Sequence, residues 1–390
     1  MVHRQQFTVP VSYDVVFTRD LFALTNLALA NVLPQAGSPA RMAVFIDSGV
    51  QQAWPGLAGK IAAWARAHND AVILPEPPMV APGGEQAKND LLFVQRITHQ
   101  LQRMQICRHS YVMAIGGGAM LDAVGLAAAV FHRGVRLIRV PTTVLAQADS
   151  GVGVKNSVNL DGVKNLIGTF APPYAVLNDT LFLQTLDERD WRGGIAEALK
   201  VAAIKDASFL DELERLAGAL VARDLDAMET VVKRCARLHL DHIATGGDPF
   251  ETGLARPLDF GHWAAHKLES MTNFALRHGE AVAIGIALDV YCAARLKFIT
   301  AGERDRICAL LRRCGLQLWH PVLEKRSGSG ALLVLNGLEE FRQHLGGRLT
   351  LTMPDGLGRK RDIHSLAPAI VADGIAWLAA THKQPLPASR

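Results

Sequence analysis

The first half of the chain alternates short β-rich runs with helical stretches, and this alternation constrains the fold more than any other feature. Strands are expected at residues 42–46, 71–74, 111–115 and 136–140, with helices at 54–68 and 88–104. Strands that alternate with helices pair in parallel and carry the helices on the faces of the sheet. The pattern therefore predicts an α/β, Rossmann-like N-terminal domain.

The second half of the chain has a different pattern, with hardly a strand after residue 187. Helices are expected at 196–205, 209–220, 226–242, 262–271, 281–294 and 304–314. We therefore expect two domains, an α/β domain of residues 1–186 and a mostly α-helical domain of residues 187–390.

The composition excludes several classes of protein. A hydrophobic fraction of 49% and a charged fraction of 20% describe a globular protein that is neither disordered nor membrane-spanning. The net charge of +4 is too balanced to favour nucleic acid as a partner. The start MVHRQQFTVP lacks a signal-peptide pattern, and the five cysteines have no CxxC spacing. We expect a cytoplasmic protein with reduced thiols.

A glycine run at residues 116–118 ends one expected strand and precedes an expected helix at 119–131. Glycines let the backbone approach a phosphate closely, and a helix N-terminus offers free N–H groups. A simple tight turn would use the same residues. Asp47 ends the first strand and suits either a ribose hydroxyl or a helix cap. Glu85 and Lys88 supply a further polar pair at a helix start.

Residues 141–165 combine glycines with polar side chains in the stretch PTTVLAQADSGVGVKNSVNLDGVKN. Lys155, Lys164 and Asn165 suit a phosphate ester, and Asp149 can orient a hydroxyl. Arg133, which follows the glycine-led helix, can join the same phosphate. A solvated polar loop is the alternative interpretation.

Histidines in the second half have the spacing of metal ligands. His262 and His266 stand four residues apart, so both imidazoles project from one face of the expected helix. His278 follows in RHGEAV at the start of another helix. Glu197 can complete a two-histidine, one-carboxylate zinc site with His262 and His278, which leaves Lys200 to face a substrate. An ordinary Glu197–Lys200 ion pair and ordinary polar histidines are the alternatives.

Taken together, these motifs resemble the 3-dehydroquinate synthase family of sugar phosphate cyclases over roughly residues 47–285. The matching stretches are GGGAMLDAVG, FHRG, PTTVLAQADSGVGVKN, GVKNLIGTF, TLDERDWRGGIAEALK, GGDPFE, GHWAAH and HGEAVAIGIAL. The resemblance implies an NAD-binding domain followed by a helical metal-binding domain. It also implies a homodimer that uses NAD and Zn²⁺, or Co²⁺, to cyclise a small phosphorylated sugar.

Position by position, the resemblance implies a role for each motif residue. The metal ligands would be Glu197, His262 and His278. NAD would be held by Asp47, Glu85, Lys88, Gly117, Gly118, Asp122, Thr142 and Thr143. The substrate phosphate would contact Arg133, Lys155, Asn165 and His266, and the catalytic set would be Asp149, Lys155, Lys164, Lys200 and His266. The implied chemistry is transient oxidation, phosphate elimination, reduction and an intramolecular aldol reaction.

The chain departs from the dehydroquinate synthases where they bind a substrate carboxylate. They place a lysine before the acidic block and an arginine seven residues before the first metal histidine. Counting back without a gap from His262 puts Asp241 and Ala255 there, with Arg256 adjacent and Asp259 in place of an asparagine. We therefore expect a neutral-headed ketose such as sedoheptulose 7-phosphate rather than 3-deoxy-arabino-heptulosonate 7-phosphate.

Other readings of the sequence remain open. The C-terminal family lysine has no clear match, and Arg342 is the candidate substitute. The motifs LDFGHW and GGDPFE are more similar to those of cyclases outside the shikimate pathway, including the cyclases encoded in ebo-type gene clusters. A true 3-dehydroquinate synthase and a polyol dehydrogenase of the same fold are the alternative enzymes. A catalytically inactive NAD-binding protein is the alternative of another class.

Overall fold

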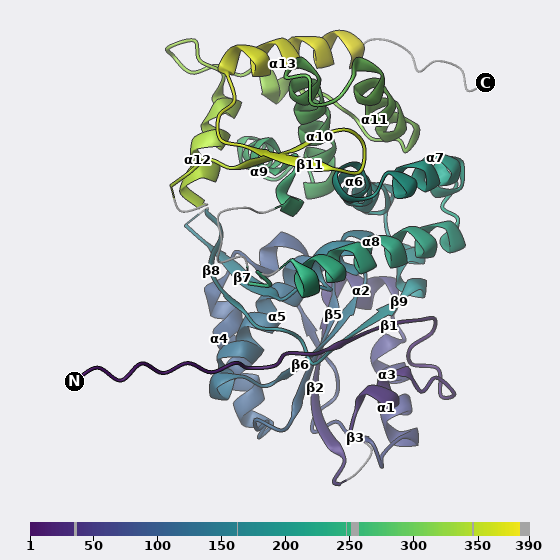
Figure 1. The fold of residues 1–390 in the computed structure, drawn as a ribbon. Helices are drawn as coiled ribbons and strands as arrows, with labels where there is room; N and C mark the ends of the chain where they lie inside the picture. Colours follow the sequence, from purple (N-terminus) through teal and green to yellow (C-terminus); the bar gives the residue numbers. More distant parts are fainter. Residues whose placement is uncertain (35–36, 162, 247, 251–256, 345–346, 383–390) are drawn as a thin grey trace. The chain divides into compact units, whose positions relative to one another are not determined.

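The computed structural model describes residues 1–34, 37–161, 163–246, 248–250, 257–344 and 347–382 (Figure 1). The chain divides into two compact units. Unit 1 comprises Met1–Thr142 and Ser150–Leu181, and unit 2 comprises Thr143–Asp149 and Phe182–Arg390. The proposed division after residue 186 lies between the short helix η4 (Thr180–Thr185) and α6 (Glu188–Lys205).

Unit 1 is built on a seven-stranded parallel sheet with the order β1-β9-β6-β5-β2-β3, in which β4 also pairs with β2. The strands are β1 (Asp14–Thr18), β2 (Ala40–Asp47), β3 (Val72–Ile73), β4 (Met79–Ala81), β5 (Tyr111–Gly116), β6 (Arg136–Pro141) and β9 (Ala175–Asp179). Its helices are α1 (Ala28–Val32), α2 (Ser48–Ala53), α3 (Leu57–Ala67), α4 (Leu91–Arg103) and α5 (Gly118–Val130). Figure 1 shows α4 and α5 on one side of the sheet and α1 and α3 on the other. The predicted α/β fold is confirmed.

Local sequence explains why these helices form where they do. The Asp90 side chain accepts from the Leu92 N–H and so caps the start of α4. Every residue of β5 is buried, as expected for a parallel strand covered on both faces. One apolar face of α4 is buried, at Phe93, Val94, Ile97 and Leu101.

Much of the stretch 141–165 forms regular structure rather than the solvated polar loop that was the alternative interpretation. Residues Ala146–Ser150 form a π-helical turn, and β7 (Lys155–Leu160) pairs antiparallel with β8 (Val163–Phe170). The cause is Arg139, which is fully buried and donates to the carbonyl oxygens of Gly151, Gly153 and Lys155 and to Asn156 Oδ1. A single guanidinium thus satisfies the backbone of the segment and ties it to the sheet.

Unit 2 is mostly helical, as predicted. Its helices are α6, α7 (Ala207–Val221), α8 (Leu225–Thr245), α9 (His262–Met271), α10 (His278–Arg295), α11 (Ala301–Arg313), α12 (Asn336–His344) and α13 (Pro368–His382). The sequence did not predict α12, α13 or the short pair β10 (Leu351–Pro354) and β11 (Lys360–Ile363). Helix α10 is buried on nearly all sides and packs against α6, α9, α11 and α13, so it forms the core of the unit.

Glycines let α6, α9 and α10 approach one another closely. A Cβ atom on Gly279 at the start of α10 would lie 2.3 Å from the carbonyl oxygen of Gly193 on α6. A Cβ atom on Gly285 would lie 2.0 Å from the oxygen of Gly261, which itself has a φ of +80° before α9. Side chains at these positions would push the helices apart. The close contacts bring the start of α10 against α6 and the start of α9 against α10.

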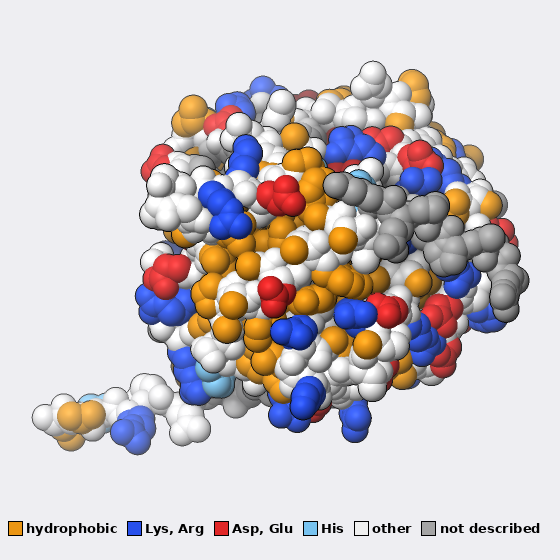
Figure 2. Space-filling view, turned by 90° about the horizontal axis from the view of Figure 1, so that it is seen from above, with side chains coloured by type: hydrophobic (Ala, Val, Ile, Leu, Met, Phe, Trp, Pro, Cys, Tyr) orange, Lys and Arg blue, Asp and Glu red, His pale blue; other side chains and the backbone are white. Residues whose placement is uncertain are grey.

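Apolar side chains gather, with scattered charges among them, on the face that carries α13 (Figure 2). Helix α13 buries Val371, Ile375 and Leu378 and exposes alanines at 369, 376 and 380. No helix among the described residues is long and apolar enough to cross a membrane. The apolar character of α13 is therefore that of a core helix with a small-residue outer face.

Candidate active site

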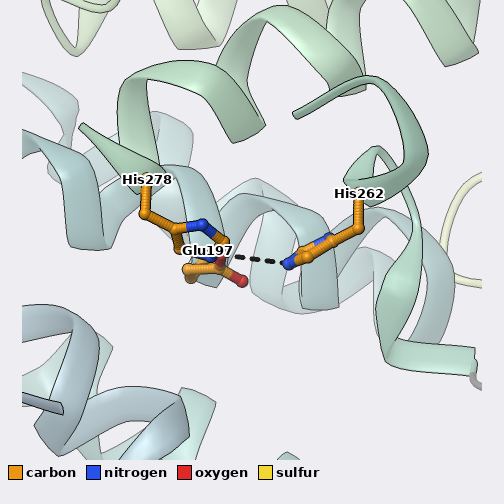
Figure 3. Close-up of side chains that lie close together, drawn as sticks. All are labelled: Glu197, His262 and His278. Atoms are coloured by element: carbon orange, nitrogen blue, oxygen red, sulfur yellow. Dashed lines mark ion pairs between the residues drawn. The ribbon is translucent and has the colours of Figure 1, made fainter. Parts of the chain in front are cut away.

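Glu197, His262 and His278 come together in unit 2 (Figure 3). Glu197 lies in the middle of α6, and the two histidines are the first residues of α9 and α10. Nε2 of His278 is 3.3 Å and Nε2 of His262 is 3.6 Å from Glu197 Oε1. One ligand atom from each residue lies within 4.8 Å of the other two. That spacing suits three ligands of a single Zn²⁺ ion.

Hydrogen bonds on the far side of each imidazole fix its orientation. His262 Nδ1 lies 3.0 Å from the carbonyl oxygen of Phe260, so Nδ1 carries the proton and Nε2 keeps its lone pair. His278 Nδ1 lies 3.3 Å from Oε2 of the buried Glu269. A carboxylate behind a ligand histidine is the usual way to set ring orientation in a metal site.

The environment of the buried Glu197 carboxylate shows whether this set of residues fits a metal ion. Neither of its oxygens accepts a well-formed hydrogen bond from a described residue, although Lys200 Nζ lies 2.6 Å from Oε2. Burial would raise the pKa of Glu197, but Lys200 and His262 outweigh burial and lower the pKa to about 2. An ionised, buried carboxylate with unsatisfied oxygens beside two imidazoles fits a divalent cation.

In the metal-free protein, His262 and His278 differ in charge. Burial, together with Lys200, lowers the pKa of His262 to about 4, so this imidazole is neutral and ready to bind. Burial also opposes a charge on His278, but Glu269 and Glu197 outweigh burial and raise its pKa to about 9. Metal binding at neutral pH must therefore displace a proton from His278.

His266 stands beside the centre, one helical turn after His262. Its ring centroid lies 5.4 Å from that of His262 and 6.0 Å from that of His278. With Glu269 and His278 it forms a second set of closely spaced donor atoms. His278 Nδ1 is already directed at Glu269 in that set, whereas its Nε2 faces Glu197. That His266 does not ligate the metal stays a prediction.

Lys200 links the centre to Asp149. Its Nζ lies 2.6 Å from Glu197 Oε2 and 3.5 Å from Asp149 Oδ2, and the side chain is 2% exposed. Burial opposes the ammonium charge, but Asp149 and Glu197, with a smaller contribution from Asp259, outweigh burial and raise the pKa of Lys200. Burial likewise opposes the charge of Asp149, but Lys200 and His239 hold its pKa well below the usual range.

Sequence reasoning missed His239, which lies on α8. Its Nδ1 atom is 2.6 Å from Asp149 Oδ1. The buried residues of α8 include Val231, Val232 and Cys235, and position 239 continues this stripe at the helical spacing of four. That periodicity was the signal that could have separated His239 from a surface histidine.

The gap-free count that placed Asp241 at the substrate head group is wrong. Helix α8 continues to Thr245, and the Asp241 side chain is 61% exposed, 3.8 Å from Arg237. Two residues along a helix turn a side chain by about 200°, so Asp241 lies on the face opposite His239. Ala255 and Arg256 lie outside the described residues.

In unit 1, the predicted cofactor residues surround the end of β2 and the start of α5. Asp47 Oδ1 accepts from the Gly49 N–H, so the side chain caps α2, the alternative that the sequence left open. Gly117 is the N-cap of α5, and a Cβ atom on Gly118 would lie 2.6 Å from Ser150 Oγ. The structure thus presents a glycine-lined helix start beside a buried carboxylate.

A second group of predicted residues is joined by hydrogen bonds and ion pairs between side chains. Lys88 Nζ lies 2.6 Å from Asp122 Oδ2 and 2.5 Å from Asn165 Oδ1. Glu85 Oε1 accepts from Asn159 Nδ2 at 2.8 Å and lies 3.8 Å from Lys164 Nζ. Residues proposed for NAD and residues proposed for phosphate are therefore direct neighbours.

The remaining predicted residues are in several places. Thr142 is buried in unit 1 and donates its N–H to the carbonyl oxygen of Gly116, next to the glycine-lined helix start. The hydroxyl of Thr143, which belongs to unit 2, accepts from the Ala146 N–H. Arg133, with a φ of +65°, and Lys155 are exposed in unit 1. Arg342 on α12 pairs with Glu339 and with the Gly347 carbonyl oxygen.

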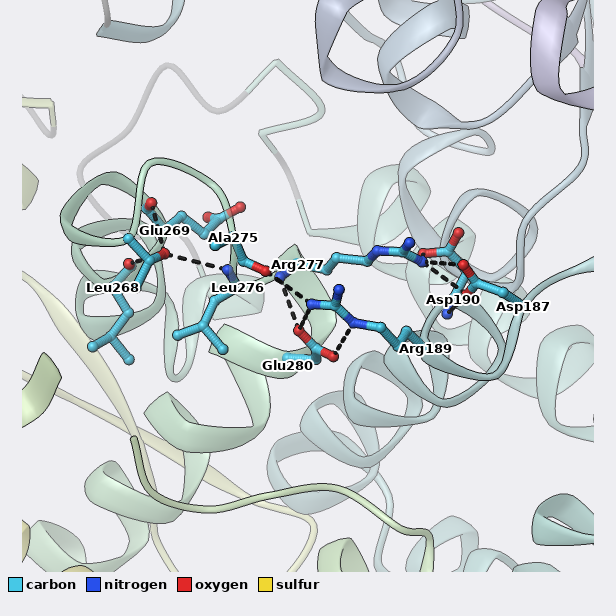
Figure 4. A network of polar contacts seen from close by, with 10 residues as sticks. Asp187, Arg189, Asp190, Leu268, Glu269, Ala275, Leu276, Arg277 and Glu280 are labelled. Carbon is cyan, nitrogen blue, oxygen red and sulfur yellow. Dashed lines mark hydrogen bonds and ion pairs between the residues drawn. The ribbon is translucent and has the colours of Figure 1, made fainter. Parts of the chain in front are cut away.

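A charged network that the sequence did not reveal joins the starts of α6 and α10 (Figure 4). Arg189 binds both oxygens of Glu280, at 2.7 and 2.6 Å. Arg277 Nη1 lies 2.7 Å from Asp187 Oδ2 and 2.7 Å from Asp190 Oδ1. Single exposed ion pairs contribute little to stability, but a linked set restrains geometry. This set holds the residue before His278 against the helix that carries Glu197.

Comparison with known proteins adds the family. Residues 78–193 match the 3-dehydroquinate synthase N-terminal family, and residues 194–332 match the 3-dehydroquinate synthase C-terminal family. A 3-dehydroquinate synthase from Acidithiobacillus ferrooxidans is 37% identical over 298 residues, which cover 76% of this chain and 79% of that protein. A 2-epi-5-epi-valiolone synthase from Actinomyces sp. is 34% identical, with 92% and 93% of the two chains covered.

A solved structure extends the likeness to three dimensions. The 2-epi-5-epi-valiolone synthase ValA from Streptomyces hygroscopicus subsp. jinggangensis 5008, with NAD⁺ and Zn²⁺ bound, superposes with a TM-score of 0.85. It is 32% identical, with 97% of this chain and 100% of that chain covered. The chain belongs to the 3-dehydroquinate synthase-like family of sugar phosphate cyclases.

Proposed function

We propose that the protein is an NAD- and zinc-dependent cyclase that eliminates phosphate from a seven-carbon phosphorylated ketose and closes a carbocycle. The observation that carries the proposal is the Glu197–His262–His278 set, which is held beside the Lys200–Asp149 ion pair. The NAD⁺ and Zn²⁺ in ValA support the same cofactors here. We also propose a homodimer, which light scattering of the purified protein would test.

The chain's own side chains have distinct roles in this proposal. Bound zinc would polarise a substrate oxygen, and NAD would take up and return a hydride. Lys200 donates to a substrate hydroxyl, and Asp149 holds that ammonium in place. Lys155, Asn165 and Arg133 bind the phosphate, for which their cationic and amide donors are suited.

The charges around the metal centre favour a substrate with a neutral head group. Asp149 and Glu197 are ionised, and Asp259 is close enough to act on the charge of Lys200. Lys200 is already paired with two carboxylates, which offset its charge. A substrate carboxylate beside Asp149 and Glu197 would be repelled by both while it loses its hydration. We therefore propose sedoheptulose 7-phosphate or a close relative as the substrate.

Phosphate release tests the proposal directly. The zinc-loaded protein is incubated with NAD and with either sedoheptulose 7-phosphate or 3-deoxy-arabino-heptulosonate 7-phosphate. We expect a higher kcat/KM for the neutral-headed sugar and no net accumulation of NADH. A higher kcat/KM for the carboxylated sugar, with dehydroquinate as the product, would instead identify a true 3-dehydroquinate synthase. Stoichiometric NADH without phosphate release would identify a polyol dehydrogenase.

A further inference from the structure

Two hydrogen bonds to Asp289 on α10 hold the residues on either side of His262. Asp289 Oδ2 accepts from the Gly261 N–H at 2.9 Å, and Asp289 Oδ1 accepts from Trp263 Nε1 at 2.8 Å. Asp289 is 1% and Trp263 is 2% exposed, so both bonds are shielded from water. A single carboxyl group therefore fixes the chain just before and just after a candidate metal ligand.

The start of α9 depends on this contact because it has no side-chain cap of its own. Gly261 is the N-cap residue and has a φ of +80°, in the left-handed region. Its carbonyl oxygen would lie 2.0 Å from a Cβ atom on Gly285. Gly285 and Asp289 stand four residues apart on one face of α10. This face of α10 thus approaches both the N–H and the carbonyl group of the residue before His262.

The same helix carries the second histidine of the centre. His278 is the first residue of α10, and Asp289 lies about three turns further along. The hydrogen bonds of Asp289 therefore place His262 relative to the helix that presents His278. The carbonyl oxygen of Phe260, 3.0 Å from His262 Nδ1, belongs to the same turn. A shift of this turn would move the His262 ring and its acceptor together, away from Glu197.

We propose that Asp289 is a positioning residue of the metal centre, which sets the place of His262 relative to Glu197 and His278. This inference rests on the proposed zinc-dependent function. Burial of a carboxyl group costs free energy that an apolar side chain of similar size does not cost, so packing alone does not account for Asp289. Two directed hydrogen bonds restrain the turn in a way that apolar contacts do not. Metal–ligand distances vary by only about 0.2 Å, so such a restraint raises metal affinity.

The zinc affinity of three variants tests the proposal. Asp289→Leu removes both acceptors, Asp289→Asn keeps one oxygen, and Trp263→Phe removes one donor but keeps an aromatic ring. We expect Asp289→Leu to bind zinc about 10- to 100-fold more weakly than wild type, with smaller losses in the other two variants. Competition with a chelator measures these affinities. The stoichiometry at saturating metal should stay at one zinc per chain, because all three proposed ligands remain.

The visible absorption spectrum of the cobalt-loaded protein reports on the geometry without substrate or NAD. The absorption of Co²⁺ depends on the number and arrangement of its ligands. We expect the bands of Asp289→Asn and Trp263→Phe to differ from those of wild type in position or intensity, because His262 is displaced. A role in stability alone would leave the spectrum of the folded variants unchanged.

Leu288→Ala is the matched control for stability. Leu288 adjoins Asp289 on α10 and is fully buried, but it faces α13, where a Cβ atom on Gly374 would lie 2.8 Å from Leu288 Cδ1. Loss of a buried side chain should make this variant unfold at a lower denaturant concentration than wild type. Its zinc affinity and cobalt spectrum should remain those of wild type.

The opposite result is equally specific. If Asp289→Asn and Trp263→Phe unfold more easily but bind zinc and cobalt as wild type does, Asp289 only stabilises the fold and the proposal is wrong. Wild-type protein that binds no zinc would refute the proposed function together with this inference. The wild-type measurement therefore distinguishes failure of the function from failure of the positioning role.

Discussion

The two units hold their functional side chains in contrasting ways. In unit 2, Glu197 is 0% and Lys200 2% exposed, and each candidate ligand histidine has a partner behind its ring. In unit 1, Arg133 and Lys155 are exposed at the ends of short elements. A metal ion needs ligands that are placed before it arrives, because its bonds tolerate little displacement. A phosphate can be met by long cationic side chains that adjust to it.

The difference predicts where substitutions act. Changes among the ligands of the centre in unit 2 should affect metal content and activity together, because these residues act on one ion. Changes among the exposed cations of unit 1 should alter substrate binding and leave the fold intact. Variants in unit 2 therefore report on metal binding, and variants among the exposed cations of unit 1 report on substrate binding.

The largest effect is expected for His262→Ala. Removing one of three protein ligands should abolish the zinc stoichiometry of one per chain and lower activity by roughly 1,000-fold or more. The imidazole is neutral when buried, so its loss leaves no unpaired charge, and the metal-free protein should stay folded. Elemental analysis, phosphate release and circular dichroism measure the three quantities.

His266→Ala is the matched control for metal content. It removes an imidazole of the same helix that lies beside the centre, and zinc should remain bound. Loss of zinc from His266→Ala, together with retention by His262→Ala, would show that the second donor set of His266, Glu269 and His278 holds the metal.

The sequence predicted the main helices and strands of both units because hydrophobic periodicity, and the residues that end helices and strands, carry that information. The parallel sheet followed from alternating apolar runs, and α9 begins at His262 and ends at Met271, as the spacing indicated. The β7–β8 hairpin was not predictable, because it depends on the buried Arg139, which is distant in sequence from part of the segment. A local pattern cannot reveal such a tertiary contact.

The candidate active site likewise contains residues that the sequence predicted and residues that it did not. Helical spacing singled out His262 and His266, and the sequence then offered His278 and Glu197 to complete a metal site. The structure brings Glu197, His262 and His278 together. His239 and Glu269 were missed because polar residues on a helix usually face solvent. The apolar stripe of α8 marks the face of His239, whereas the burial of Glu269 follows only from the packing of α9. The count to Asp241 failed because it took no account of the face of α8 on which each residue lies.

The second prediction concerns how stability depends on pH, and it rests on the buried Asp289 on α10. Its carboxylate accepts from Trp263 Nε1 and Gly261 N, yet burial raises its pKa to about 7. The folded state then holds a proton that the unfolded state has released. Stability should fall as the pH rises from about 4 to about 7, by about 3 kcal/mol between pH 5 and pH 8.

Asp289→Asn isolates this contribution because an amide does not titrate. The substitution weakens one of the two hydrogen bonds at every pH, so the difference from wild type should shift in favour of the variant as the pH rises. Denaturant unfolding at pH 5 and pH 8 gives the comparison. A difference that does not change with pH would show that Asp289 is ionised throughout.

A smaller effect is expected for Glu269→Gln, which leaves all three proposed ligands in place. Glu269 accepts from His278 Nδ1 and stabilises its orientation. The amide should reduce zinc affinity about 10- to 100-fold without changing the stoichiometry at saturating metal. Competition with a chelator measures the affinity. The same substitution should lower the pKa of His278, so that less proton is released when zinc binds. An unchanged affinity would mean that packing alone orients the ring.

The smallest effect is expected in unit 1, at Asp47. The carboxylate caps α2 through Gly49, and burial raises its pKa although surrounding backbone N–H groups oppose that effect. If Asp47 also accepts from the cofactor ribose, a 2′-phosphate there would be repelled, and NAD should bind better than NADP. Asp47→Asn keeps a capping oxygen but removes the charge, so the preference should shrink several-fold while stability changes little. Equal affinity of the wild-type protein for both cofactors, measured by calorimetry, would leave Asp47 with the capping role alone.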